Sequence, residues 1–480
     1  MSDPDSRSMP RQTLRLTPRL LQALLSVCLA LGLSGGLCLP AQAQPGRATA
    51  PAAKPAATPA ATAVVAPAAA ASAPAPVSAT ARRVYERARG QLLQIRTLLK
   101  NQDSQASVGS GFVVSEDGHV ITNYHVISQF ALEPDRYRLR YAGTEGQGGA
   151  LELLDFDVRR DLALLRVADL KNVPAMQFRP QSQPLSKGDR IYSMGNPHDV
   201  AFAVVEGNFN GLVERSFDAL IYYSGSINSG MSGGPVVDED GRVVGVNVSA
   251  MFFAQQMSFL VPAEYAEALL QRSRNAKPIT QAAWPRLTEQ LKRYQDELVG
   301  RFMEQPWRSA GHARYQLPVP QEQFMRCWGR GTPADSKGLE FQRSQCRMEH
   351  AVFINGEMQT GYLDMSHEAY DGSKLGALRF ARQYSNSFRN ERLGRDDRDR
   401  TAPFCKEDFV QRDGLPLRAV VCLRAYRKLS GLHDLSVLVT TVDADTEGAL
   451  GRFDAKGVSF ANAIKLADHY LKGFAWSTPR

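Results

Sequence analysis

Cysteine is absent from the middle of this 480-residue sequence, because none stands between Cys38 and Cys327. A disulfide therefore cannot brace this long stretch, and whatever folds there must rely on a packed core. Such a core is within reach of the composition, since 43% of the residues are hydrophobic and 22% are charged.

Long apolar runs are also scarce, and the one from Leu20 to Leu39 follows four arginines near the N-terminus. Ala41-Gln42-Ala43 then supplies the small-x-small pattern of a signal-peptidase site. Residues 1–43 are therefore predicted to be a signal peptide of an exported protein, periplasmic or secreted in a bacterium. An uncleaved membrane anchor is the alternative, because the run nearly suffices to span a bilayer.

Residues 44–80 lack any apolar periodicity and consist almost entirely of Ala, Pro, Thr and Ser. Such a segment cannot bury a core, and it is predicted to be a disordered linker.

Four cysteines lie in the last third of the chain: Cys327, Cys346, Cys405 and Cys422. An even number in an exported chain predicts two disulfides, with three pairings open. A zinc site is the alternative, but no pair has the close spacing of zinc ligands. No metal is therefore expected.

Charge is unevenly distributed, and residues 276–480 carry 31 Lys and Arg against 25 Asp and Glu. No recognition motif accompanies this dilute excess, so a nucleic-acid partner is not expected. An envelope polymer or a partner protein is the expected ligand of this region.

After the linker, the pattern of apolar residues and turn signals divides the chain into two further segments. Residues 81–275 contain many short apolar runs, joined by turn signals such as Asp117-Gly118 and Asp240-Gly241, which predicts an all-β barrel domain. Residues 276–480 are predicted to form an α+β domain. Its predicted helices are 287–304, 375–386 and 459–474, and its predicted strands are 347–355, 358–365, 418–427 and 434–442. The order suggests a duplicated strand-strand-helix unit, each copy opening with a cysteine pair.

The barrel segment contains candidates for every group that acyl transfer needs. Ser232 lies in Gly-Met-Ser-Gly-Gly-Pro, where glycines permit a tight turn that exposes the hydroxyl. The N–H groups of Gly230 and Ser232 are the candidate oxyanion donors. A plain glycine-rich turn between strands is the alternative interpretation.

The candidate base is His125, at the end of an apolar strand. The candidate orienting acid is Asp161, which leads the apolar run Leu162–Val167, with Asp155 and Asp157 as the other acids considered. Among the remaining histidines, His119 follows a turn and is expected to be exposed, and His198 is expected in a loop.

These strings, in the order His, Asp, Ser, resemble the trypsin-like serine peptidases, most closely the bacterial HtrA/Deg protease domain. The matching segments are Gly109–Val114, Thr122–His125, Asp161–Leu165, Gly188–Pro197, Gly230–Pro235 and Ser258–Pro262. The resemblance implies two packed six-stranded β-barrels with the triad between them. It also implies endopeptidase activity on proteins or peptides, without a cofactor.

The resemblance further places the floor of the specificity pocket at Ser226, where a trypsin-type pocket carries an acid. Without that acid a buried Lys or Arg is unpaired, so cleavage after small or medium apolar residues is expected. Asn247, Val248 and Ser249 are expected to form the strand edge that pairs with substrate.

Two features depart from the family pattern. Met231 precedes the candidate nucleophile where the family usually has Asn or Asp, and the last third lacks the pattern of a PDZ domain. A catalytically idle pseudoprotease that acts as a binding module is therefore the alternative function.

Overall fold

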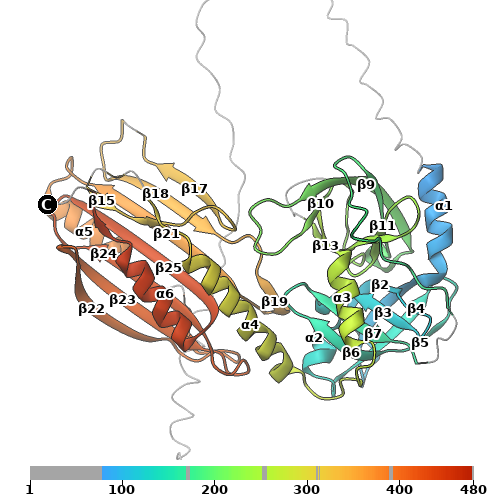
Figure 1. Ribbon diagram of the computed structural model, residues 1–480. Coiled ribbons are helices and arrows are strands. Elements are labelled where there is room, and N and C mark those ends of the chain that lie inside the picture. The colour runs from blue at the N-terminus through green and yellow to red at the C-terminus, as the bar shows by residue number, and fades with distance from the viewer. Residues whose placement is uncertain are drawn as a thin grey trace, which may run out of the picture. The chain divides into compact units, whose positions relative to one another are not determined.

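The computed structural model describes residues 78–477, apart from 169–172, 251–256, 310–311, 313, 334 and 389–392 (Figure 1). The predicted signal peptide, residues 1–43, and nearly all of the predicted linker, residues 44–80, lie outside the described residues. Among the helices that are described, none combines the length and the apolar content needed to cross a membrane.

The first half of the barrel segment forms one seven-stranded antiparallel sheet in the order β5-β4-β1-β2-β3-β7-β6. Its strands are β1 (Leu92–Leu99), β2 (Gln105–Val113), β3 (His119–Thr122), β4 (Tyr137–Gly143), β5 (Gly148–Ala150), β6 (Glu152–Asp157) and β7 (Leu162–Arg166). The prediction of six strands in a closed barrel was wrong for this half, because the short strand β5 adds a seventh. The sheet curls strongly, and Leu151 N–H, just before β6, donates to the carbonyl of Leu139 in β4.

The second half forms a closed barrel of six strands, as predicted, in the order β10-β13-β12-β11-β8-β9. The strands are β8 (Arg190–Gly195), β9 (Ala203–Leu212), β10 (Ile221–Tyr223), β11 (Pro235–Val237), β12 (Val243–Ala250) and β13 (Ser258–Pro262). The surrounding helical elements are α1 (Ala79–Ala88), η1 (Arg89–Gln91), α2 (Tyr124–Leu132), η2 (Pro197–Asp199) and α3 (Ala263–Ser273).

The C-terminal region contains both helices and strands, built around a second seven-stranded antiparallel sheet in the order β17-β18-β21-β25-β24-β23-β22. These strands are β17 (Arg326–Gly331), β18 (Glu340–Arg347), β21 (Tyr362–Asp371), β22 (Phe404–Arg412), β23 (Leu415–Ala425), β24 (Leu432–Thr441) and β25 (Glu447–Ser459). Short pairs accompany them: β14 (Arg308–Ser309) with β16 (Pro318–Val319), β15 (Tyr315–Gln316) with β26 (Ala475–Trp476), and β19 (Val352–Asn355) with β20 (Met358–Thr360).

Three helices pack on this sheet: α4 (Trp284–Met303), α5 (Ala377–Ser387) and α6 (Phe460–Lys472). They lie within a few residues of the predicted helices. Apolar side chains of α4 and α6 join those of β24 and β25 in one core, whereas Phe380 of α5 packs with Tyr370 and Leu450 on the opposite face. The helices therefore cover both faces of the sheet.

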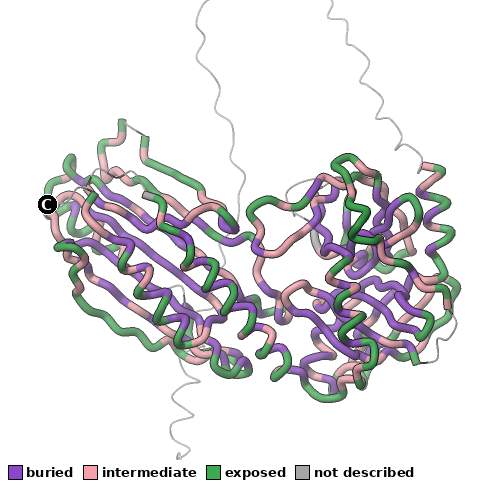
Figure 2. Tube along the Cα trace, viewed as in Figure 1, coloured by how far each residue is buried: buried purple, intermediate pink, exposed green. Residues whose placement is uncertain are grey.

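The predicted strand 347–355 was wrong, because β18 ends at Arg347 and β19 begins at Val352. The chain leaves the sheet between them to form the small β19–β20 hairpin. Strands β17 and β22 were not predicted, because both are largely exposed and lack an apolar alternation (Figure 2).

Both disulfides are present, and they select one of the three pairings, Cys327–Cys346 and Cys405–Cys422. Each joins residues directly opposite one another on an outer strand and its neighbour, β17 with β18 and β22 with β23. The cysteines thus tie both edges of the sheet to its interior.

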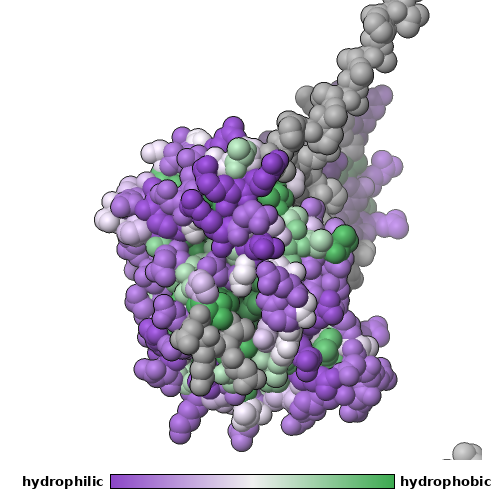
Figure 3. Space-filling model, turned by 90° about the vertical axis from the view of Figure 1, so that its right-hand side faces the viewer, coloured by the Kyte–Doolittle hydropathy of each residue, from purple (hydrophilic) through white to green (hydrophobic). Residues whose placement is uncertain are grey.

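A single hydrophobic core contains residues from both the barrel segment and the C-terminal region. Phe217, which precedes β10, lies 5.4 Å between ring centroids from Tyr294 of α4 and 5.3 Å from Phe324. Arg159 forms ion pairs with Asp218 and with Glu297 of α4 at the same boundary. By contrast, the face shown in Figure 3 is mainly hydrophilic, with hydrophobic residues only in small scattered groups.

Candidate active site

His125 and Asp161 are held in direct contact. His125 lies in the first turn of α2, and its Nδ1 is 2.5 Å from Oδ2 of Asp161. The backbone N–H of His125 donates to the other carboxylate oxygen at 2.8 Å. The carboxylate therefore orients the imidazole and also satisfies a free N–H at the start of the helix.

The backbone of Asp161 is itself fixed in an unusual conformation. Its φ of 53° lies in the left-handed region, which costs energy for a residue other than glycine. Its carbonyl accepts hydrogen bonds from the Asn123 side chain at 2.8 Å and from the Tyr124 N–H at 3.1 Å. The residues immediately before His125 thus hold the acid that orients it.

Ser232 lies in the turn between β10 and β11, which is shaped by glycines. Gly230 and Gly233 have φ values of 93° and 83°, which other residues rarely adopt. A Cβ on Gly233 would lie 2.8 Å from the backbone nitrogen of Asn123. The carbonyl of Ser232 accepts from Ser110 N–H at 2.8 Å. The turn is therefore packed against the strand ends that lead to His125.

The Ser232 hydroxyl forms no hydrogen bond with His125 among the residues that the structure describes. Within the same residues, the N–H groups of Gly230 and Ser232 have no protein acceptor. Two free donors flanking a serine are what an oxyanion requires.

The pKa of His125 reflects opposing effects. Burial disfavours the charged ring, but the negative charge of Asp161 and its hydrogen bond outweigh burial and raise the pKa above 6.5. Charge on the ring is thus stabilised, which is what a base that transiently holds a proton needs.

Asn247, which was predicted to pair with substrate, contacts the serine turn. It is fully buried, and its N–H and carbonyl bond to Gly234 and Gly233, while its amide nitrogen reaches the carbonyl of Met231 at 3.2 Å. Its backbone groups and one amide hydrogen bond thus hold the serine turn, while its side-chain oxygen accepts from Ser193 Oγ at 2.8 Å and its amide nitrogen also donates to the Met194 carbonyl at 3.0 Å. Val248 is half-buried, and Ser249 pairs through its backbone with Phe259 of β13.

The burial of His119 and of Ser226 differs from what their expected places in the fold suggest. His119 is buried rather than exposed, since its ring contacts Ser115 Oγ at 2.6 Å and the Arg274 carbonyl at 2.9 Å. Ser226 is exposed, while the neighbouring Ile227 is buried. A residue at the floor of a deep pocket is normally buried, so Ser226 has no such surroundings in the absence of substrate.

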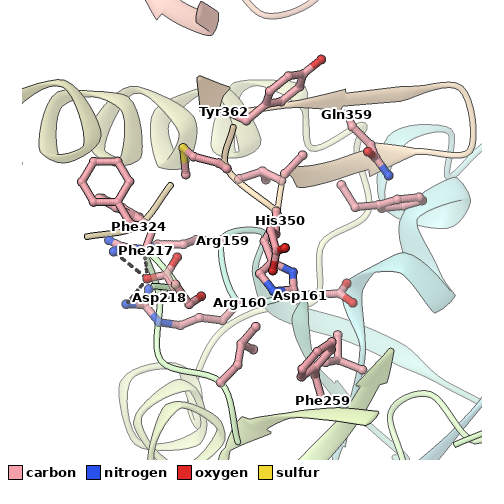
Figure 4. Close-up of a pocket in the computed structure, with 18 of the residues that line it drawn as sticks. Arg159, Arg160, Asp161, Phe217, Asp218, Phe259, Phe324, His350, Gln359 and Tyr362 are labelled. Atoms are coloured by element: carbon pink, nitrogen blue, oxygen red, sulfur yellow. Dashed lines mark hydrogen bonds and ion pairs between the residues drawn. The ribbon is translucent and has the colours of Figure 1, made fainter. Parts of the chain in front are cut away.

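A cavity of about 950 Å³ lies beside His125 and Asp161, bounded by both barrel and C-terminal residues. Figure 4 shows Gln359 and Tyr362 on one side of it and Phe259 of β13 on the other, with Asp218 bonded to Arg159. The C-terminal contribution was missed at the sequence level, because nothing in residues 347–362 marks them as neighbours of His125. Within the described ranges, no three His, Cys, Asp or Glu side chains are grouped to hold a metal.

The barrel segment is similar in sequence to known proteins. Residues 109–246 match the family model described as a trypsin-like peptidase domain. A probable periplasmic serine endoprotease DegP-like from Chlamydia muridarum is 34% identical over 153 residues, which cover 31% of this chain and 29% of that protein. Serine protease HTRA1 from Xenopus laevis is 29% identical over 194 residues, 38% of this chain and 40% of the relative.

Among solved structures, the serine endoprotease from Yersinia pestis is 24% identical with a TM-score of 0.36, covering 42% of this chain and 68% of that one. The chain thus spans less than half the length of these two curated relatives. The similarity concerns the barrel segment, which resembles an HtrA-type trypsin-like serine protease domain.

Proposed function

We propose that this protein, whose barrel segment resembles an HtrA-type serine protease domain, is a serine endopeptidase acting through an acyl-enzyme. The observation that carries the proposal is the His125–Asp161 pair, held beside the glycine-shaped turn of Ser232. Protein or peptide substrates follow from this activity, and no cofactor is required by it.

In the proposed mechanism, Ser232 Oγ attacks the peptide carbonyl carbon while His125 Nε2 accepts the hydroxyl proton. The carbonyl oxygen becomes an oxyanion that the N–H groups of Gly230 and Ser232 stabilise. The C–N bond then breaks as the imidazolium returns the proton to the leaving amine, which leaves an acyl-serine. Water, deprotonated by His125, hydrolyses the ester and restores Ser232.

The hydroxyl must approach His125 before the first step, because no hydrogen bond joins them among the described residues. Catalytic hydrogen bonds commonly shorten only in the substrate complex. The same observation favours a second candidate function, a pseudoprotease that binds polypeptides without cleaving them.

Casein hydrolysis separates the two functions. We expect hydrolysis by wild type, and by Ser229→Ala, which alters an exposed serine of the same turn, but none by Ser232→Ala. A fluorophosphonate probe should label wild type and Ser229→Ala at Ser232. Absence of labelling and hydrolysis in folded wild type would establish the pseudoprotease.

We expect cleavage after small or medium apolar residues, because Ser226, which the resemblance places at the pocket floor but which is exposed in this structure, supplies no negative charge for a basic side chain. Profiling with a peptide library tests this preference. Efficient cleavage after Arg would contradict it.

The proposed location is the bacterial periplasm or the exterior. The two disulfides support it, because disulfides persist in oxidising compartments. Detection in a periplasmic fraction of the source cells tests the location.

An envelope polymer or a partner protein is our proposed ligand for residues 276–480, on the basis of their excess of Lys and Arg. Co-sedimentation of the full-length Ser232→Ala variant with peptidoglycan tests binding to this polymer. If the variant stays in the supernatant at every salt concentration, peptidoglycan is excluded as the ligand.

A further inference from the structure

The β19–β20 hairpin of the C-terminal region lies directly over the candidate base. The ring of Phe353 meets the imidazole of His125 edge to face, with 6.0 Å between centroids. Phe353 also lies 6.5 Å from the ring of Tyr124. Through these contacts, a segment of the C-terminal region touches the candidate base directly.

The segment that leads into this hairpin reaches the barrel on the other side of the cavity. His350 stands edge to face on Phe259 of β13, with 5.6 Å between centroids. Its Nε2 is shielded from solvent and has no hydrogen-bond partner in the described part of the chain. Burial lowers the pKa of His350, so the ring is neutral near pH 7 and presents an unused hydrogen-bonding atom.

The cavity between these contacts has the size and chemistry of a peptide-binding pocket. Its volume of about 950 Å³ lies at the upper end of the range for ligand sites. Its lining includes four arginines and four carboxylates, whose charges balance, so the cavity does not favour a ligand of either charge. The remaining lining is mostly aliphatic and aromatic, including Val248, Phe259 and Phe353.

Strand β12 leads from the serine turn into this cavity. Its pairing with β11 reaches Val246 and Pro235, and the backbone bonds of Asn247 to Gly234 and Gly233 continue it into the serine turn. Val248, the next residue, lines the cavity. Among the described residues, none pairs with this edge of β12 at Val248, so a peptide that paired there would pass from Ser232 along Val248 and under the hairpin.

We propose that residues Met348–Phe353 form one wall of the substrate cleft and select peptides carrying a large apolar side chain near the scissile bond, at a position other than the one immediately before it. The ring of His350 would turn so that its Nε2, shielded in this structure, bonds to the peptide beside that side chain. This inference rests on the proposed endopeptidase function, and it makes the C-terminal region part of the specificity of that site.

Ala351→Trp tests the wall, because Ala351 is half-buried and lines the cavity. We expect kcat/KM for library peptides with Phe or Leu near the scissile bond to fall roughly tenfold or more, and that for peptides with Gly or Ala there to change little. Ala351→Leu should produce the same trend, more weakly. The matched control is Glu357→Ala, at the exposed tip of the hairpin, which should leave the profile unchanged.

His350→Ala tests the proposed contact with peptide. It should raise KM for the preferred peptides several-fold, with kcat maintained, since it removes binding rather than chemistry. His350→Phe keeps the ring packing on Phe259 and should show the same rise in KM.

Fluorophosphonate labelling of Ser232 distinguishes a failure of the proposed wall from a failure of the proposed endopeptidase activity. If the Ala351 and His350 variants are labelled and their cleavage profile is unchanged, the proposed wall is wrong while the proposed endopeptidase activity stands. Folded wild type that is neither labelled nor active would remove the proposed function, and the inference would fall with it.

Discussion

The hydroxyl of Tyr124 donates a hydrogen bond to the carbonyl of Ile354 at 3.1 Å, although 230 positions separate the two residues. Tyr124 immediately precedes His125 and is fully buried. The residue next to the candidate base is therefore anchored to the hairpin of the C-terminal region.

Replacing Tyr124 by Phe should lower the free energy of unfolding by about 1–3 kcal/mol, because a buried carbonyl loses its donor. Urea unfolding measures the change. Tyr222→Phe is the control, since the Tyr222 hydroxyl has no bond to any described residue, and it should be neutral. Equal stability of the two variants would show that the contact contributes nothing.

Replacing Asp161 by Asn should reduce kcat by about 10⁴-fold, because the amide cannot hold the imidazole in the productive tautomer. Casein or peptide hydrolysis measures it, with the exposed Asp117 changed to Asn as control. Retention of most activity by Asp161→Asn would argue against Asp161 as the orienting acid.

The pH profile should follow His125, which must be neutral to act as a base. Because its pKa is raised above 6.5, the acid limb of kcat/KM should lie above pH 6.5 in wild type. In the residual activity of Asp161→Asn, the limb should move to lower pH, because burial then acts without the opposing carboxylate. If the acid limb lies at the same pH in wild type and Asp161→Asn, the titrating group is not His125.

Replacing Gly230 by Ala should abolish hydrolysis and destabilise the fold by about 1–3 kcal/mol, because a Cβ there would overlap the carbonyl of Asn196 at a φ of 93°. The control is Gly300→Ala in α4, where nothing lies within 4 Å of the new Cβ. That variant should be stabilised by up to about 1 kcal/mol. Thermal melting and casein hydrolysis report both effects.

Each disulfide should contribute about 3 kcal/mol, since the pairs close loops of 19 and 17 residues. Urea unfolding of the C-terminal sheet should therefore shift with reductant in wild type. In a variant with all four cysteines changed to Ser, reductant should have no effect. Identical curves for wild type with and without reductant would contradict the prediction.

The local features of the site could be predicted from sequence, because each rests on a short string. The turn of Ser232 needs glycines at Gly230 and Gly233, and Asp161 stands at the head of an apolar strand. The helices α4, α5 and α6 also follow from local patterns, whereas the six strands of the second barrel were implied by the family resemblance.

Features that depend on long-range pairing could not be predicted. Asn247 lies in the expected strand, but only the fold shows that the serine turn consumes its backbone groups. His119 follows a turn, yet Arg274, 155 positions later, covers it. The exposed strands β17 and β22 carry little apolar periodicity, so their place in the sheet is set by partners and not by their own residues.

The shared core has a consequence for engineering. Composition changes near residue 275, but Phe217 before that point packs on Tyr294 and Phe324 after it. A gene fragment ending there would lack Tyr294 and Phe324, leave Phe217 exposed to solvent, and be expected to aggregate. Joining the barrel segment to a different C-terminal region would therefore require a redesigned apolar interface around Phe217. The two parts cannot be exchanged as independent domains.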